Sequence, residues 1–167
     1  MAAPDLDMPG LLGPLPPTVA QRLRAAEDLL LDRVLEAARA SSEDQGRPLR
    51  GAADRGIRTG VRAAVDEFLA LVADPEHDLG PAREVFRQLG REEFRDGRFI
   101  DALRSTLGAG TQAIWAVLVE LGNAGEVEPE HLHALAGALL PFLDQLSSAA
   151  AEGYLEEQER TSIDVGM

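Results

Sequence analysis

The sequence predicts an all-α protein with five to six helices, and three observations lead to this prediction. Apolar residues recur at three- and four-residue spacing in five segments. Proline and glycine separate these segments, and no stretch of useful length alternates between apolar and polar side chains. With 167 residues, of which 45% are hydrophobic, the chain is long enough for one domain with a substantial core. We expect that domain to span residues 18–160.

The first 17 residues contain five prolines, which cannot sustain a regular hydrogen-bonded ladder. We therefore expect residues 1–17 to form a flexible or extended arm. Thr18 follows, with Gln21 three residues later, and this pair has the pattern of a capping box at a helix start.

The first long helix is expected to run from Thr18 to about Ala40. Its apolar residues occupy more than one side, because Leu31 and Leu35 broaden the stripe that faces the core. A helix of this kind has two neighbours, and the second neighbour could be another subunit. Leu31 and Leu35 are therefore the candidate residues for a homodimer interface.

A polar loop at residues 41–51 precedes the second helix, which Ala73-Asp74-Pro75 should end because proline disfavours helical geometry in the residue before it. A shorter third helix should begin near Pro81, since proline suits the first helical turn.

The fourth helix carries the longest apolar stripe, from Phe99 to Leu121, and Gly122-Asn123 should end it. Pro129 should begin the fifth helix. Pro141 lies inside this helix and is expected to kink it.

The apolar stripe of the fifth helix thins after Leu146, so Pro141 is expected to divide a packed first half from a looser second half. Residues 161–167 would be a tail or the start of a linker. We expect the fifth helix to carry a signal out of the domain.

Composition argues against several classes of protein. The net charge of −13 opposes binding to nucleic acid, and residues 116–167 hold ten acidic side chains against one basic, Arg160. The absence of cysteine excludes disulfides and thiolate sites. No signal peptide and no apolar run long enough for a membrane span is apparent. We expect a cytoplasmic protein that contacts neither membrane nor nucleic acid.

The three histidines do not have the spacing of a metal or haem site. His77 lies in a Pro-Glu-His-Asp segment between helices, and His131 and His133 are two residues apart. On a helix that spacing places them on different faces, whereas a metal site prefers residues four apart. We expect no metal and no cofactor.

Gly108-Ala109-Gly110 has a superficial likeness to a phosphate-binding loop. No strand precedes it and no lysine follows it, so both partners of that motif are missing. We instead expect Gly108 and Gly110 to permit the close crossing of another helix.

Trp115 is the only tryptophan in a chain that is 4% aromatic. It could form the wall of a ligand pocket together with Phe99 and Leu103, or it could be an ordinary core residue. Both interpretations stay open on the sequence.

Catalytic patterns are absent. The carboxylates of Glu92-Glu93 and Glu156-Glu157 are adjacent in sequence, and adjacent positions on a helix diverge by about 100°. No Gly-x-Ser-x-Gly nucleophile motif is present either. We expect a protein that is not an enzyme.

The segment Gly97-Arg98-x-x-Asp101-x-Leu103, with Trp115 behind it and the Tyr-x-x-x-Gln pattern that begins at Tyr154, resembles the amino-terminal sensory segment of actinobacterial PucR/CdaR-type transcriptional regulators. That segment is similar to the haem-free, globin-like amino-terminal domain of the stressosome co-antagonist (RsbR-like) family. The resemblance covers roughly residues 18–160.

The resemblance implies a globin-like helical bundle that serves as a sensory and dimerisation module. It also favours a structural cluster of Glu93, Gly97, Arg98 and Asp101 at the corner between the third and fourth helices. The implied partners are a second copy of the chain, output domains of the same polypeptide, and an unknown small-molecule effector.

Full-length regulators of this type carry a central GGDEF-like region and a carboxy-terminal helix-turn-helix, and neither is present here. We therefore expect either a piece of a longer regulator or a stand-alone relative, and the end of the sequence soon after the fifth helix favours a piece. A globin-type ligand- or cofactor-binding protein, or a small helical enzyme, is the alternative.

Overall fold

The computed structural model describes residues 8–13, 15–46 and 51–166, and these residues form helices and connecting turns without a strand. The all-α prediction is confirmed for this part of the chain. Its helices are α1 (Met8–Leu12), α2 (Pro17–Ala25), α3 (Glu27–Asp44), α4 (Ala52–Ala73), α5 (Gly80–Arg95), α6 (Ile100–Asn123) and α7 (Pro129–Val165).

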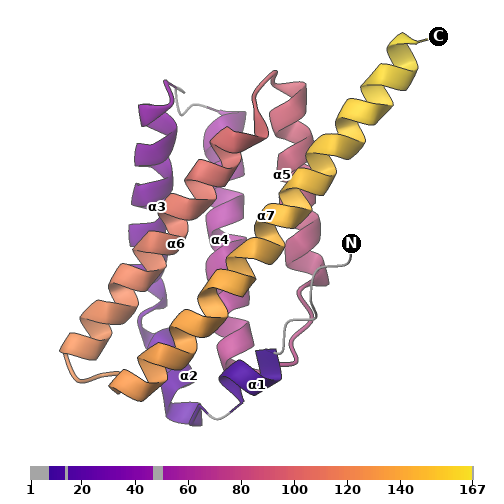
Figure 1. Ribbon diagram of the computed structural model, residues 1–167. Coiled ribbons are helices and arrows are strands. Elements are labelled where there is room, and N and C mark those ends of the chain that lie inside the picture. Colours follow the sequence, from indigo (N-terminus) through magenta and orange to yellow (C-terminus); the bar gives the residue numbers. More distant parts are fainter. Residues whose placement is uncertain (1–7, 14, 47–50, 167) are drawn as a thin grey trace.

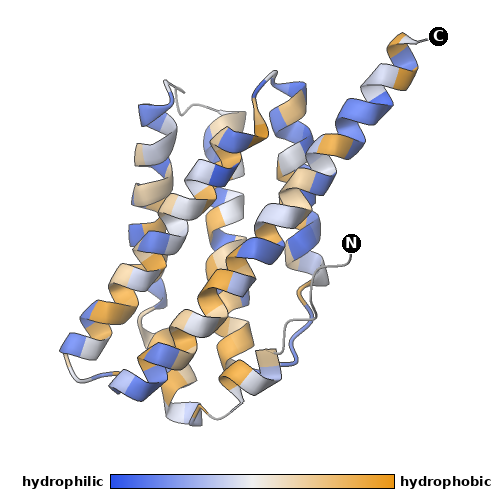
Figure 2. Ribbon diagram, in the orientation of Figure 1, coloured by the Kyte–Doolittle hydropathy of each residue, from blue (hydrophilic) through white to orange (hydrophobic). Residues whose placement is uncertain are grey.

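In the view of Figure 1, α3, α4 and α5 stand side by side, and α6 and α7 run in front of them on a slant. The most extensive packing joins α5 to α7, and α3 to α6. The end of α7 projects past the other helices (Figure 1), and its residues 158–166 are exposed. Hydrophobic residues concentrate on the lower part of the bundle, whereas the projecting end of α7 is largely hydrophilic (Figure 2).

The amino-terminal segment differs from the expected arm. Residues 8–12 form α1, which packs mainly against α7 and buries Met8 and Leu12 in the common core. Pro9 lies in the first turn of α1, where its missing N–H is not needed for helical hydrogen bonding. The expectation of an extended arm is wrong for residues 8–12, and its residues 1–7 and 14 lie outside the described part of the chain.

The expected first long helix is two helices, α2 and α3, which meet at Ala26 (φ −93°, ψ 9°). The helix begins at Pro17, and no side chain caps its first turn. The predicted capping box of Thr18 and Gln21 is therefore wrong. Proline at the first helical position fixes φ in the helical range, which starts the helix without a side-chain cap.

The later helix boundaries follow their turn residues as predicted. α4 ends at Ala73, α6 ends at Asn123, and α5 and α7 each have proline in the first turn. Gly97 (φ 74°) ends α5 in a Schellman motif: its N–H donates to the Phe94 carbonyl at 3.0 Å and the Arg98 N–H to the Glu93 carbonyl at 3.0 Å.

The predicted division of the last helix at Pro141 is wrong. α7 continues through Pro141 as one helix of 37 residues (Figure 1). Burial also continues after Leu146, at Ala149, Ala150, Gly153 and Glu157. Small residues replace large apolar ones there, so the stripe thins in the sequence while the helix stays packed.

Among the described helices, α7 alone is long and apolar enough, by length and composition, to cross a membrane. The core helix of a soluble protein passes the same test. The buried leucines of α7, Leu135, Leu139 and Leu146, belong to the core of the bundle, which explains the apolar composition of this helix.

Candidate functional site: the α5–α7 seam and an adjoining cavity

The backbones of α5 and α7 touch at two glycines. A Cβ atom placed on Gly90 would overlap the carbonyl oxygen of Ala150, and a Cβ placed on Gly153 would overlap the carbonyl oxygen of Arg87. Only glycine allows two helix backbones to come this close. This close crossing, which we call the α5–α7 seam, fixes α7 against α5 along its second half.

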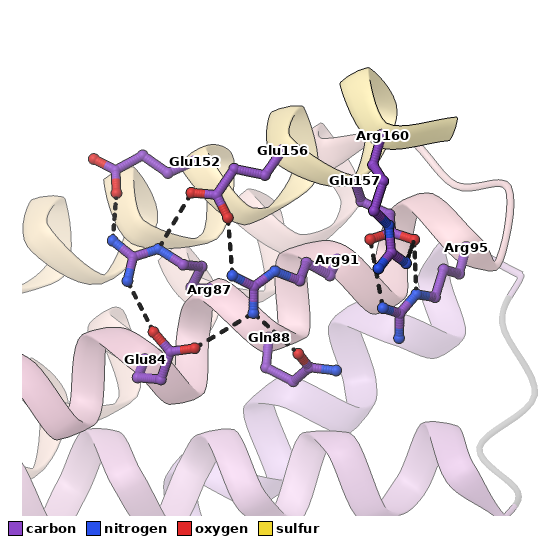
Figure 3. Close-up of polar contacts among 9 residues, drawn as sticks. All are labelled: Glu84, Arg87, Gln88, Arg91, Arg95, Glu152, Glu156, Glu157 and Arg160. Atoms are coloured by element: carbon purple, nitrogen blue, oxygen red, sulfur yellow. Dashed lines mark hydrogen bonds and ion pairs between the residues drawn. The ribbon is translucent and has the colours of Figure 1, made fainter. Parts of the chain in front are cut away.

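Arginines four residues apart on α5 line the seam and bind carboxylates of α7 (Figure 3). The Arg87 guanidinium donates to Glu152 at 2.8 Å, and that of Arg91 donates to Glu156 at 2.8 Å. Both arginines also bind Glu84 within α5, at 2.8 and 3.3 Å. The hydrogen bond from Arg87 is the main cause that lowers the pKa of Glu84.

A third arginine completes the row near the end of the seam (Figure 3). Arg95 Nε donates to Glu157 at 3.0 Å, and Arg160 binds the same carboxylate at 2.8 Å. The Glu157 side chain is only 6% exposed, whereas its two arginine partners are 45% and 64% exposed. The hydrogen bond from Arg95, assisted by Arg160, lowers the pKa of Glu157. This buried carboxylate therefore stays ionised at neutral pH.

The predicted helix-corner cluster forms in part. Glu93 is buried, and Gly97 and Arg98 form the turn that ends α5. The Tyr154 hydroxyl donates to the Arg98 carbonyl at 2.7 Å, which ties this corner to α7. Asp101 does not join, because its side chain is 88% exposed and faces only Arg104 at 4.0 Å.

Gly108 and Gly110 are not the site of the close helix crossing. A Cβ on Gly108 would meet nothing within 4 Å, and a Cβ on Gly110 would meet a side-chain atom of Val34 at 3.3 Å. Neither glycine approaches another backbone as Gly90 and Gly153 do. A close helix crossing at glycines does occur, but between α5 and α7 and not on α6.

A cavity of about 900 Å³ lies on the other side of α5, between α5, α4 and the facing parts of α3 and α6. Its volume falls within the roughly 300–1,000 Å³ of small-molecule sites. Of the three candidate pocket residues, Leu103 lines the cavity, but Phe99 and Trp115 do not. Phe99 precedes α6 and is 80% exposed, and Trp115 is partly exposed on α6.

The remaining candidates lie away from the seam and the cavity. Leu31 and Leu35 are half-buried and pack against the core of the same chain, so the second apolar side of that helix is largely used within the monomer. His77 binds Glu67 at 2.6 Å. His131 lies near Glu128 and Glu130 at the start of α7. The possible ligand atoms of these three residues lie within 4.8 Å of one another, and this spacing alone would allow a metal ion.

The adjacent carboxylates have different environments. Glu156 and Glu157 bind different arginines of α5, and Glu93 is buried while Glu92 is exposed. Neither pair converges on one point, as their helical spacing predicts. Glu156 and Glu157 join α7 to α5.

The model of the PucR-like N-terminal domain family matches residues 13–165. The chain belongs to this family. The match includes both sides of the seam and all the helices that surround the cavity. No curated protein and no solved structure matches the chain.

Membership of the family makes the domain a regulatory module of the kind found at the amino terminus of PucR-like transcriptional regulators. The seam is therefore a feature of a regulatory domain. The sequence held a signal for Gly90 and Gly153 that local periodicity does not reveal. Arg87 lies three residues before Gly90 and Arg91 one residue after it, and Gly153 lies between Glu152 and Glu156. Arginines around a glycine of one helix and glutamates around a glycine of another are a pattern that could predict the contact between these two helices.

Proposed function

We propose that this domain senses a signal and passes it through α7 to an output domain that binds DNA. The observation that carries the proposal is the α5–α7 seam, which joins α7 rigidly to the sensory bundle along residues 149–157. The exposed, hydrophilic end of α7 then leaves the bundle (Figure 2). A movement of α5 would be transmitted along α7, because the two backbones are in direct contact at Gly90 and Gly153 and therefore move together.

A charge exchange at the seam tests this proposal in a regulator that carries this domain before its DNA-binding domain. Arg91→Glu places a carboxylate opposite Glu156 and Glu84, and we expect a changed output of a transcriptional reporter. The double variant Arg91→Glu, Glu156→Arg restores an opposite pair across the seam. We expect it to return the output towards that of the parent.

The control is Arg104→Glu, which changes the same charge on the exposed surface of α6. Its reporter output should match that of the parent. An unchanged output in a folded Arg91→Glu regulator would contradict transmission through the seam, and so would a double variant that behaves as the single one does.

We further propose that the domain is a cytoplasmic homodimer and that its bundle is related to the haem-free globin-like sensory domains. Large apolar side chains left exposed on the monomer, among them Trp115 on α6 and Leu140 on α7, support the dimer. They are better placed for a partner than Leu31 and Leu35, which the monomer already covers in part.

A globin-type cofactor carrier is the alternative function. Against it, none of the three histidines lines the cavity between α4 and α5. The absorbance spectrum of the purified protein decides between the two. A Soret band that is lost when one histidine is replaced would favour the alternative.

A further inference from the structure

Much of the cavity wall consists of apolar side chains that lack a full set of packing partners. Ile57 on α4, Val85 and Leu89 on α5, and Leu103 and Leu107 on α6 all line it, and all five stay partly exposed although they pack against the core. Apolar surface of this kind is stabilised when a ligand removes it from water, by about 25 cal/mol per Å².

Small residues on α4 create the space. Gly56 and Gly60 line the cavity, together with the alanines at positions 52, 53 and 64. Gly60 lies directly against Leu89, since a Cβ there would come within 3.1 Å of the Leu89 Cδ1 atom, whereas a Cβ on Gly56 would meet Leu89 only at an ordinary 3.5 Å. The helix gives up about 1 kcal/mol per glycine relative to alanine.

The charged groups at the rim favour an uncharged ligand. Among the described residues, six charged side chains line the cavity, four of them acidic; they are Arg55, Glu84, Glu92, Glu93, Arg95 and Asp96. Glu84 is bound to Arg87 and Arg91, and Arg95 is bound to Glu157, so these two groups are engaged with the seam. The excess of carboxylates opposes the binding of an anion. The apolar walls offer no compensation for a buried charge.

We propose that this cavity is a binding site for a small, uncharged and largely apolar molecule. The inference gives the proposed sensory function its ligand and rests on that function for its biological role. Helix α5 connects the two features: Val85 and Leu89 face the cavity, while Arg87, Gly90 and Arg91 face α7. A ligand bound between α4 and α5 would displace α5, and α7 would move with it.

Two fluorophores of one ring framework test the site on the purified 167-residue protein. N-phenyl-1-naphthylamine is uncharged, and 8-anilinonaphthalene-1-sulfonate carries a sulfonate. We expect saturable binding of the uncharged probe with one site per chain, and at least tenfold weaker binding of the sulfonate. An equal or stronger affinity for the sulfonate would overturn the assignment of an uncharged ligand.

Gly56→Leu fills the cavity from α4, and Gly108→Leu is the matched control on α6, where an added Cβ meets nothing within 4 Å. We expect Gly56→Leu to weaken binding of the uncharged probe at least tenfold and Gly108→Leu to leave the affinity within twofold of the parent. Leu89→Gln keeps the size of the side chain, adds an amide to the wall, and should also weaken binding.

Circular dichroism shows which variants remain folded, and if Gly56→Leu is not folded, Leu89→Gln decides by the same criterion. No saturable binding to the parent, or parent-like binding to a folded cavity variant, would overturn the inference. Binding without any change of reporter output would uphold the site and contradict the proposed transmission. A reporter that responds to the seam variants, together with no probe binding, would uphold the proposed transmission and contradict the binding site.

Discussion

Two glycines set the distance between the helices that matter most in this domain. Gly90 and Gly153 each place a backbone hydrogen where any other residue would place a carbon atom against a carbonyl oxygen of the partner helix. Because protein interiors are close-packed, the added carbon can be accepted only if α5 and α7 separate. The arginine–glutamate pairs on both sides would lengthen with them.

Gly153→Ala should therefore destabilise the domain, by about 1–3 kcal/mol, through overpacking. Gly108→Ala is the matched control, because its added methyl group meets nothing and raises helix propensity by about 1 kcal/mol. Thermal unfolding should show opposite shifts of a few degrees in the two variants, given roughly 2–4 °C per kcal/mol at this chain length. A Gly153→Ala protein as stable as the parent would show that the seam can accept an added methyl group, which contradicts the close contact of the two backbones.

Helix α7 acquires its position from three kinds of contact along one line. Apolar residues up to Leu146 enter the core, Ala150 and Gly153 touch the α5 backbone, and glutamates from Glu152 to Glu157 bind arginines of α5. The Tyr154 hydroxyl adds a hydrogen bond to the corner at Arg98. These contacts hold the helix in place as far as its projecting end.

The carboxylates of the seam make the stability of the domain depend on pH. Arginine partners lower the pKa values of Glu84 and Glu157 below the usual 4.5, so their contribution is fully present above that value. It is lost as the pH falls through the lowered pKa values of the folded state, because the unfolded chain takes up protons first. Urea midpoints should thus be level near neutral pH and fall below about pH 4.5.

Glu157→Gln provides the control for this pH dependence. It removes the titrating carboxylate while preserving the shape of the side chain, so the variant should be less stable at pH 7 and show a shallower fall in acid. A parent and variant with parallel pH profiles would contradict the assignment of this dependence to Glu157.

At the scale of the whole molecule, the distribution of exposed apolar residues predicts self-association. Trp115→Ser combined with Leu140→Glu should convert the proposed dimer into a monomer, since both side chains lie on the surface and their loss leaves the core intact. Light scattering at tens of micromolar measures the mass. A parent protein of monomer mass would contradict the dimer, and a dimer that persists in the double variant would place the interface elsewhere.

The charge of the whole molecule predicts that it does not bind DNA by itself. Its net charge of −13 repels phosphate, and the exposed end of α7 carries Glu159 and Asp164 beside a single arginine, Arg160. Electrophoretic retardation of duplex DNA near 150 mM salt should be absent, as it should be for a domain whose output lies elsewhere in a regulator. Retardation at that salt concentration would contradict this view.

The helical class and the boundaries at Ala73, Pro81, Asn123 and Pro129 could be predicted from the sequence alone. This was possible because apolar periodicity and the backbone limits of proline and glycine act over a few residues. Prediction failed where burial outweighed local preference, as at residues 8–12, where the apolar side chains of Met8 and Leu12 hold a proline-containing segment in a helix.

Which glycines are in contact, and which side chains of α6 face the cavity, depends on the tertiary structure. Gly108 and Gly153 both lie inside helices in the sequence, but one faces open space and the other a carbonyl oxygen of α5. Leu103 faces the cavity, whereas Trp115 on the same helix does not. The pairing of helix faces depends on residues more than fifty positions apart, and a local pattern carries no information about the side that a distant helix covers.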